Sequence, residues 1–184
     1  MGELSADDVI ALLGLEPHHT CGFVTATFHS GDVLPAAALP ARYGDAARRD
    51  RSLGTVLYFM VTADAHIVVH SIRSDQVYHH YLGAPLEVLL LYPDGRGETR
   101  VCGPDLAAGH RPQLFVPAGT VHVSRVLGGS GYALLGTSEW IEVDPSDVTT
   151  PDPASLAAAW PAMATEIERF VAGAPVTRPL ARRG

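Results

Sequence analysis

Histidine is the residue type in this sequence that is best suited to chemistry, and the chain contains nine of them. Side chains along a β-strand alternate between its two faces. Three apolar segments of this chain carry polar side chains at alternate positions. If those faces all point inward, one interior contains the following residues: His70, Ile72, Gln76, Tyr78, His80, His122 and Ser124.

Such an interior is suited to acid–base chemistry. Histidine titrates near neutral pH, so one ring can accept a proton while another donates one. We predict that His70, His80 and His122 are catalytic, and that Tyr78 donates to a developing oxyanion. We expect four further side chains to bind the substrate: Gln76, Ile72, Ser124 and Phe59. The chemistry fits an isomerase, epimerase, dehydratase or cyclase that acts on a small carbonyl-containing metabolite. Secondary metabolism is a suitable setting for such an enzyme. Nothing in the sequence favours one of these four reactions over the others.

Two alternatives stay open. If their geometry converges, His70, His80 and His122 form a three-histidine site for a divalent ion such as Zn, Fe or Ni, as in a metal-dependent oxygenase. Gln76 stands where a carboxylate ligand would help, and a neutral amide is a weak ligand for such an ion. We therefore expect that no cofactor is required. The second alternative is a non-catalytic module that binds a small ligand.

The elements that must position these residues are almost all strands. Turn-forming Gly, Pro and Asp residues separate eight apolar segments of even spacing, which is typical of a β-sandwich or closed barrel. An earlier segment, 23–28, is rich in β-formers and has no charge. The eight predicted strands are Thr55–Val61, His66–Ile72, Gln76–Leu82, Leu86–Tyr92, Thr99–Cys102, Gln113–Val116, Val121–Leu127 and Tyr132–Thr137.

Helices are predicted only at the two ends of the chain. Ser5 begins a short capped helix that ends at Gly14. Asp152, followed by a proline, begins a helical tail over 152–173, and Pro161 should divide that tail in two. Apolar residues spaced by three and four fall on one face of the tail, and we expect them to pack against the barrel. They are Leu156, Trp160, Met163, Ile167 and Phe170.

Several other polar residues receive less specific predictions. Glu139 follows the last predicted strand and is expected at the barrel rim, with a position facing the pocket mouth as the alternative. The arginine-rich segment 35–52 is expected to form a solvated loop or a subunit contact rather than an anion site. Four histidines lie near turns and are expected to be exposed: His18, His19, His29 and His110.

Length and composition set the class of protein. A chain of 184 residues with 47% hydrophobic and 18% charged residues fits one globular domain, with a barrel core over about 20–148. The net charge of −7 disfavours a nucleic-acid partner. No apolar run approaches the length that spans a bilayer, so we expect no membrane partner. Two cysteines without a Cys-x-x-Cys pair, together with the absence of a signal segment, favour a cytoplasmic protein.

Two motifs resemble those of the cupin superfamily. The run from His70 through Gln76 to Gly83 resembles the first cupin motif, and the run from Pro117 through Gly119 to His122 resembles the second. The resemblance implies an all-β fold, a double-stranded β-helix or cupin jelly-roll barrel. With the predicted ends of the chain, this barrel has a short N-terminal helix and C-terminal helices.

Within the superfamily, the sequence is similar to the cupin-five subfamily, a domain of unknown function, over about residues 9–148. Leu13–His18, Thr55–Phe59 and Val116–Gly119 carry this resemblance together with the first motif. It implies a shape similar to that of sugar-nucleotide epimerases and a dimer. We expect a homodimer in which the strand at 23–28, or the loop after it, forms part of the interface.

Overall fold

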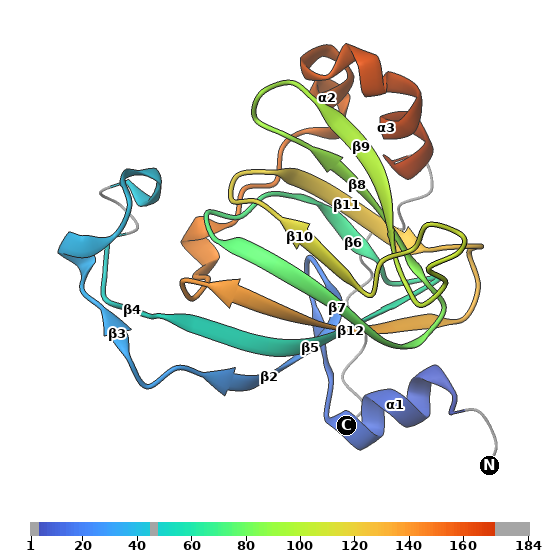
Figure 1. Ribbon diagram of the computed structural model, residues 1–184, viewed down its shortest axis with the longest axis horizontal. Coiled ribbons are helices and arrows are strands. Elements are labelled where there is room, and N and C mark those ends of the chain that lie inside the picture. Colours follow the sequence, from blue (N-terminus) through green and yellow to red (C-terminus); the bar gives the residue numbers. More distant parts are fainter. Residues whose placement is uncertain (1–3, 45–47, 172–184) are drawn as a thin grey trace.

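The computed structural model describes residues 4–44 and 48–171 and contains two facing antiparallel sheets (Figure 1). The larger sheet has the strand order β1-β2-β5-β12-β7-β10. Its strands are β1 (Glu16–His18), β2 (Gly22–His29), β5 (Gly54–Thr62), β12 (Tyr132–Trp140), β7 (Asp75–Gly83) and β10 (Gln113–Val116). The smaller sheet has the order β6-β11-β8-β9. Its strands are β6 (Ile67–His70), β11 (Val121–Val126), β8 (Leu86–Leu91) and β9 (Gly97–Cys102).

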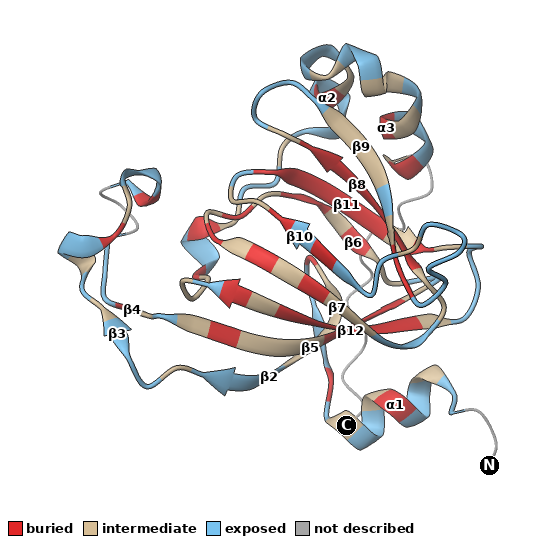
Figure 2. Ribbon diagram, in the orientation of Figure 1, coloured by how far each residue is buried: buried red, intermediate tan, exposed pale blue. Residues whose placement is uncertain are grey.

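The smaller sheet is covered on both faces, which explains why its central strand β8 is buried along its whole length. All six residues of β8 are buried, as Figure 2 shows along the strand. One face contributes Leu86, Val88 and Leu90 to the barrel lumen. The other face contributes Leu89 and Leu91 to a second core beneath the C-terminal helices. This arrangement is the jelly-roll barrel that the sequence predicts, and the all-β prediction is confirmed.

The N-terminal helix begins and ends where the sequence predicts. It is α1 (Ala6–Leu13), and Ser5 and Asp8 form a reciprocal capping box at its start. Gly14 ends the helix with a φ of 61°, in the left-handed region that glycine adopts at little cost. Buried Val9 packs with Met60 and Leu134 on the outer face of the larger sheet.

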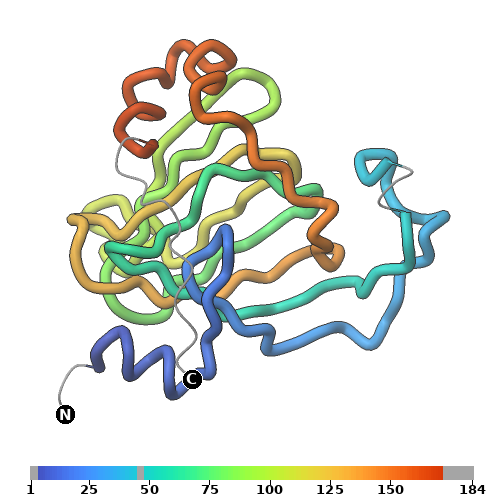
Figure 3. Tube along the Cα trace, turned by 180° about the vertical axis from the view of Figure 1, so that it is seen from behind, coloured from blue at the N-terminus to red at the C-terminus, as the bar shows by residue number. Residues whose placement is uncertain are grey.

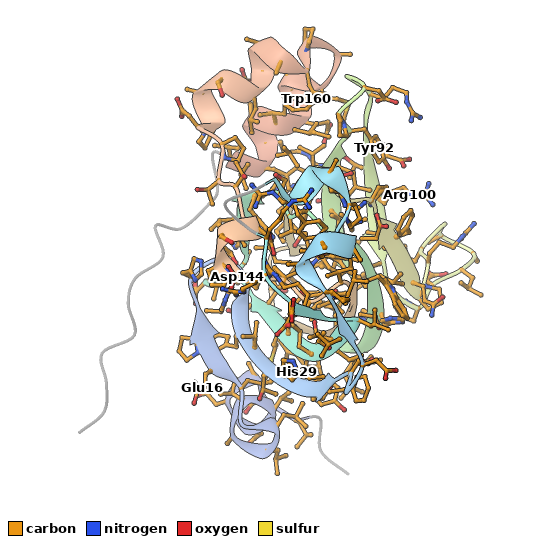
Figure 4. The ribbon with its side chains drawn as sticks, turned by 90° about the vertical axis from the view of Figure 1, so that its left-hand side faces the viewer. Glu16, His29, Tyr92, Arg100, Asp144 and Trp160 are labelled. Atoms are coloured by element: carbon orange, nitrogen blue, oxygen red, sulfur yellow. The ribbon has the colours of Figure 1, made fainter. Side chains whose placement is uncertain are left out.

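The C-terminal tail also follows the prediction. Asp152 caps α2 (Pro153–Ala159), a 3-10 turn (Pro161–Met163) interrupts the helix, and α3 (Ala164–Val171) follows. The predicted stop at Gly173 lies outside the described residues. Figure 4 shows Trp160 beside Tyr92, whose carbonyl accepts a hydrogen bond from the indole Nε1 at 2.9 Å. These helices therefore cover the smaller sheet on the side away from the lumen.

Most of the described part of the arginine-rich segment is exposed, as expected of a solvated loop, but its end at Arg51 is buried. Seen from behind in Figure 3, the chain between β2 and β5 extends away from the barrel and returns. It contains the short pair β3 (Val33–Leu34) and β4 (Arg51–Ser52) and 3-10 turns at Ala36–Ala38 and Ala41–Tyr43. Arg51 is only 1% exposed because its guanidinium pairs with the buried Asp147 carboxylate at 3.0 Å. A buried ion pair, rather than solvent, thus holds the end of this segment.

One strand boundary matters for the site. Strand β12 continues to Trp140, three residues beyond its predicted end at Thr137. It pairs with β5 along one edge and with β7 along the other, so its last residues stay within the sheet. Glu139 is consequently a strand residue whose side chain points into the barrel, at 8% exposure, and the prediction of a rim position is corrected.

Candidate active site

A cavity of about 200 Å³ opens at one end of the lumen. Its polar walls come from β6, β7 and β12, which contribute His70, Gln76, Tyr78, Thr137 and Glu139. Apolar side chains make up much of the rest of the wall: Val24, Leu57, Phe59, Ile67 and Ile72. The cavity is thus an apolar chamber with a few convergent polar groups, the usual form of a small-molecule site.

Glu139 is the acidic group in this chamber. It lies directly opposite Thr55 on β5 and Gln76 on β7. The Thr55 hydroxyl donates a 2.6 Å hydrogen bond to Oε2, and the Gln76 side chain is a second partner. Burial raises the pKa of Glu139 above its ordinary value, although both hydrogen bonds act in the opposite direction. This carboxyl therefore keeps its proton to a higher pH than an exposed glutamate does.

The two histidines of the cupin motifs lie against each other, with ring centroids 4.2 Å apart. His70 Nδ1 lies 2.8 Å from the Val68 carbonyl oxygen, and His122 Nδ1 lies 3.1 Å from that of Thr120. A carbonyl only accepts, so each Nδ1 carries the proton and each Nε2 carries the lone pair. Both rings are therefore fixed in one tautomer by the backbone of their own strand or turn.

Burial also keeps these rings neutral. It lowers the pKa of His70 to about 4, and it lowers the pKa of His122 well below its ordinary value. The neighbouring His70 ring adds to the shift at His122 because two charged rings would repel each other. At neutral pH each of the two rings is thus uncharged, and its Nε2 can accept a proton but has none to release.

Tyr78 links the cavity to the buried histidine. Its hydroxyl lies 3.0 Å from His122 Nε2, the nitrogen that carries the lone pair, so the phenol is the donor. Burial raises the pKa of Tyr78 well above its ordinary value, which keeps that proton in place. The sequence predicts that the Tyr78 hydroxyl donates a hydrogen bond to a substrate oxyanion. In the structure this hydroxyl donates its hydrogen bond to His122 Nε2 instead.

Two polar atoms in the cavity wall have no hydrogen-bond partner among the described residues. They are Oε1 of Gln76 and Oγ1 of Thr137, and both side chains are at most 5% exposed. A buried polar group without a partner costs about 1–3 kcal/mol. A ligand that satisfied these atoms would therefore gain affinity and orientation from them.

The predicted site residues are only partly brought together. His70, Tyr78, Gln76, Ile72 and Phe59 line the cavity, as expected. His122 lies behind Tyr78, and Ser124 is buried deeper along β11; neither lines the cavity. His80 is also absent from the lining, and its Nε2 bonds to the Ala84 carbonyl at 3.0 Å.

The position of His80 has a simple geometric reason. Alternation along β7 places His80 on the same face as Gln76, but four residues at about 3.3 Å each separate the two by about 13 Å. His80 therefore lies toward the opposite end of the barrel, where its side chain contacts the turn after β7. The alternating pattern predicts which face of the strand a side chain lies on, but it does not predict how far along the barrel that side chain lies.

These positions do not fit a metal centre of the cupin kind. Within residues 4–44 and 48–171, no three His, Cys, Asp or Glu side chains are arranged to hold a metal ion. Both nitrogens of His122 are engaged, by Thr120 and Tyr78. His80 is remote, and the position of the usual carboxylate is the amide of Gln76.

Sequence reasoning missed several residues of the mouth. His18 and His19 are exposed, as expected, but they also line the cavity together with Cys21. Strand β1 explains their position, because its pairing with β2 turns the N-terminal segment across the open end of the barrel. The segment is too short to give an alternation signal, so the sequence alone gives no indication of this strand.

The opposite wall of the mouth is held by ion pairs. Val143, Pro145 and Val148 line the cavity on either side of a 3-10 turn at Pro145–Asp147. Asp147 is buried between two guanidinium groups, Arg51 at 3.0 Å and Arg73 at 3.2 Å. The turn is thereby anchored to the barrel and to the extended segment, which gives the cavity a fixed wall on this side.

Comparison with known proteins gives the family. The model of a Cupin superfamily family, Cupin_5 (DUF985), matches residues 7–139. This chain belongs to that family. The resemblance found in the sequence motifs is thus confirmed, and the cupin barrel described above is the fold shared with this family.

Two solved structures resemble this cupin along nearly their whole length. Protein SO0799 from Shewanella oneidensis is 26% identical, with 91% of this chain and 98% of that chain covered and a TM-score of 0.75. A hypothetical protein from Leishmania major is 21% identical with the same coverage and a TM-score of 0.76. None of the curated proteins matches this sequence.

Among the described helices, none has the length and apolar character needed to cross a bilayer.

Proposed function

We propose that this cupin is an enzyme that moves a proton next to a carbonyl group of a small metabolite, as an isomerase, epimerase, dehydratase or cyclase does. One observation carries the proposal. A buried carboxyl with a raised pKa, Glu139, shares a mostly apolar cavity with a neutral histidine, His70. Paired acid–base catalysis uses two titratable groups in different surroundings, which favour the protonated form of one group and the unprotonated form of the other.

The two groups have complementary roles. When Glu139 is protonated, a form that its raised pKa makes more populated than in an exposed glutamate, it donates its proton to the carbonyl oxygen while His70 Nε2 removes a proton from the adjacent carbon. The products of this step are an enol, a Glu139 carboxylate and a His70 imidazolium. Returning the proton to a different position or face of the enol gives an isomer or epimer and restores both groups. The low pKa of His70, about 4, keeps the ring unprotonated at pH 7 and therefore available as the base.

Tyr78 and Gln76 position the pair. Tyr78 spans from the cavity to His122 and fixes that ring beside His70. Gln76 bonds to Glu139 and presents its free Oε1 to the cavity. The surrounding apolar wall excludes water, which strengthens each of these interactions.

Proton exchange tests the proposal without knowledge of the natural substrate. Small cyclic ketones such as 2-hydroxycyclohexanone are incubated with the protein in D₂O, and NMR follows loss of the signal from hydrogen next to the carbonyl. Exchange is expected with the wild type and with His79→Asn, a matched histidine change on the outer face, where His79 bonds to Ser138. Equal exchange rates in wild type and a Glu139→Gln, His70→Asn double variant would contradict the proposal.

The metal-dependent alternative makes a different prediction. A cupin oxygenase would retain close to one equivalent of Zn, Fe or Ni when purified without a histidine tag. We propose that no metal is required, on the basis of the engaged nitrogens of His122 and the remote position of His80. Elemental analysis decides, and exchange activity that disappears with a chelator and returns with one of these metals would support the alternative. A non-catalytic ligand-binding cupin would bind these ketones without exchange.

We also propose a cytoplasmic homodimer. Both cysteines, Cys21 and Cys102, are free, in keeping with a reducing compartment. One edge of β2 pairs with β5, and on its other edge β1 pairs only with the first residues of β2. Within the described residues, this other edge therefore has no partner strand from Thr25 to His29. Sedimentation at micromolar concentration should give twice the 19.5 kDa chain mass, and a monomer would contradict the proposal.

A further inference from the structure

The inner wall of the cavity presents three hydrogen-bond acceptors to a ligand. His70 Nδ1 donates to Val68, which leaves Nε2 as an acceptor. The Tyr78 hydroxyl donates to His122, which leaves its oxygen as an acceptor. The Gln76 amide is a partner of Glu139, and its Oε1 has no partner among the described residues. Three neighbouring side chains thus present lone pairs to one chamber, since each uses its N–H or O–H within the protein.

The charge of the lining points in the same direction. Among the described residues that line the cavity, none is Arg or Lys. The ionisable acid, Glu139, would repel an anion in its charged form, and at neutral pH the lone pairs of Gln76 and His70 would do so as well. A carboxylate or phosphate buried here would leave water without a compensating partner, at a cost of several kcal/mol.

The size of the chamber limits the ligand further. An apolar cavity of about 150 Å³ is sufficient for benzene. At about 200 Å³, this cavity has room for one six-membered ring with one or two small substituents. The apolar wall around Phe59 and Leu57 would contact the ring, while the substituents would face Gln76 and Thr137.

We infer that the substrate is a compact single-ring molecule that carries hydroxyl or ammonium donors and no carboxylate or phosphate. This inference rests on the proposed function in taking the same cavity as the site. It separates this cavity from a sugar-nucleotide site, because a pyrophosphate requires cationic side chains or clustered N–H donors. The donor of the ligand satisfies Gln76 Oε1, and the Thr137 hydroxyl pairs with a second polar atom of the ligand.

Four ligands with the same ring test the inference: benzyl alcohol, benzylammonium, benzoate and toluene. Their dissociation constants are measured by NMR titration at pH 7.5, where benzoate is ionised and the amine is protonated. Benzyl alcohol, benzylammonium or both should bind at least tenfold more tightly than toluene and benzoate, and the comparison of the first two identifies the preferred donor. Binding of toluene or benzoate as tight as that of the better donor ligand, or no binding of any of the four at millimolar concentration, would overturn the inference.

A pair of glutamine variants locates the contact. Gln76→Leu removes the free Oε1 and should weaken binding of the better donor ligand at least tenfold while leaving toluene unchanged. Gln113→Leu alters an exposed glutamine on β10 that contacts His79 on the outer face, and it should leave all four affinities unchanged. Equal loss in both variants would overturn the inference. If Gln76→Leu does not fold, the ranking of the four ligands on the wild type decides alone. Binding requires no turnover, so absent proton exchange contradicts only the proposed function, and a wrong ranking contradicts only this inference.

Discussion

The two ends of the barrel lumen are built from the same strands but differ in chemistry. At the open end, β7 and β12 place Gln76, Thr137 and Glu139 around a cavity. At the other end, the two sheets bring together Leu86, Val126 and Ala133, which are each at most 2% exposed and belong to the apolar core of the barrel. The contrast shows that one inward face of a strand can carry a reactive site and a stabilising core about 13 Å apart.

Removing the acid at the open end should have the largest effect. Glu139→Gln keeps the size and the hydrogen-bonding capacity of the side chain but removes the transferable proton. We expect the exchange rate with a reactive ketone to fall by about 10²- to 10⁴-fold, the usual contribution of a general acid or base. The unfolding midpoint in urea should show that the variant is still folded. A decrease of less than about threefold would mean that the open end does not supply the acid.

Truncation of an apolar side chain should distinguish the two ends by stability. Leu86 is fully buried at the closed end, so Leu86→Ala should cost about 2–5 kcal/mol of unfolding free energy. Leu57 borders the cavity and is only partly buried, so Leu57→Ala should cost clearly less, because it enlarges a space that already exists. Urea denaturation measures both. An equal loss of stability would remove the distinction between a packed end and an open end.

Acidification should destabilise the open end through its histidines. The pKa of His70 is lowered from 6.5 to about 4, so the neutral ring contributes stability that is fully present above pH 6.5 and is lost as the pH falls through about 4. The shift corresponds to roughly 3 kcal/mol. Between pH 7.5 and pH 4, the unfolding free energy of His70→Asn should fall less than that of the wild type. Parallel pH profiles would show that His70 is not buried in its neutral form.

The smallest effect is expected at His80, although the sequence places it among the catalytic residues. His80→Asn removes a hydrogen bond to Ala84, worth about 1 kcal/mol, and leaves the cavity wall intact. The ketone exchange rate should therefore match that of the wild type. If the exchange rate instead fell as far as it does in Glu139→Gln, His80 would be a catalytic residue, as alternation along the strand predicts.

These residues show how far the sequence leads. Alternation correctly predicts that Gln76, Tyr78 and His122 face inward, and capping patterns correctly predict α1 and α2. The depth of His80 is not predictable in this way, because every second residue shares a face whatever its distance from the mouth. The sequence favours a rim position for Glu139 over the pocket mouth because β12 continues beyond Thr137 only through pairing with β5 and β7, and such long-range pairing leaves no local signal.

The buried partners of charged groups are missed for the same reason. Arg51 lies in a segment whose composition is typical of a solvated loop, but its partner Asp147 is 96 residues further along the chain. The Ser5 cap, by contrast, involves a residue only three positions away. Interactions within one turn are encoded locally, whereas the wall of the cavity depends on contacts that form only in the folded barrel.

The pKa of Glu139 tests the central claim most directly, since that claim is a buried acid in a small apolar cavity. Carbon-13 NMR of the glutamate side-chain carboxyls, with Glu139→Gln used to assign the resonance, gives the titration curve in the folded protein. We expect a pKa above the ordinary 4.5, raised by burial, and a further change when a ligand that satisfies the cavity binds. A midpoint at or below 4.5 that no ligand alters would contradict the account.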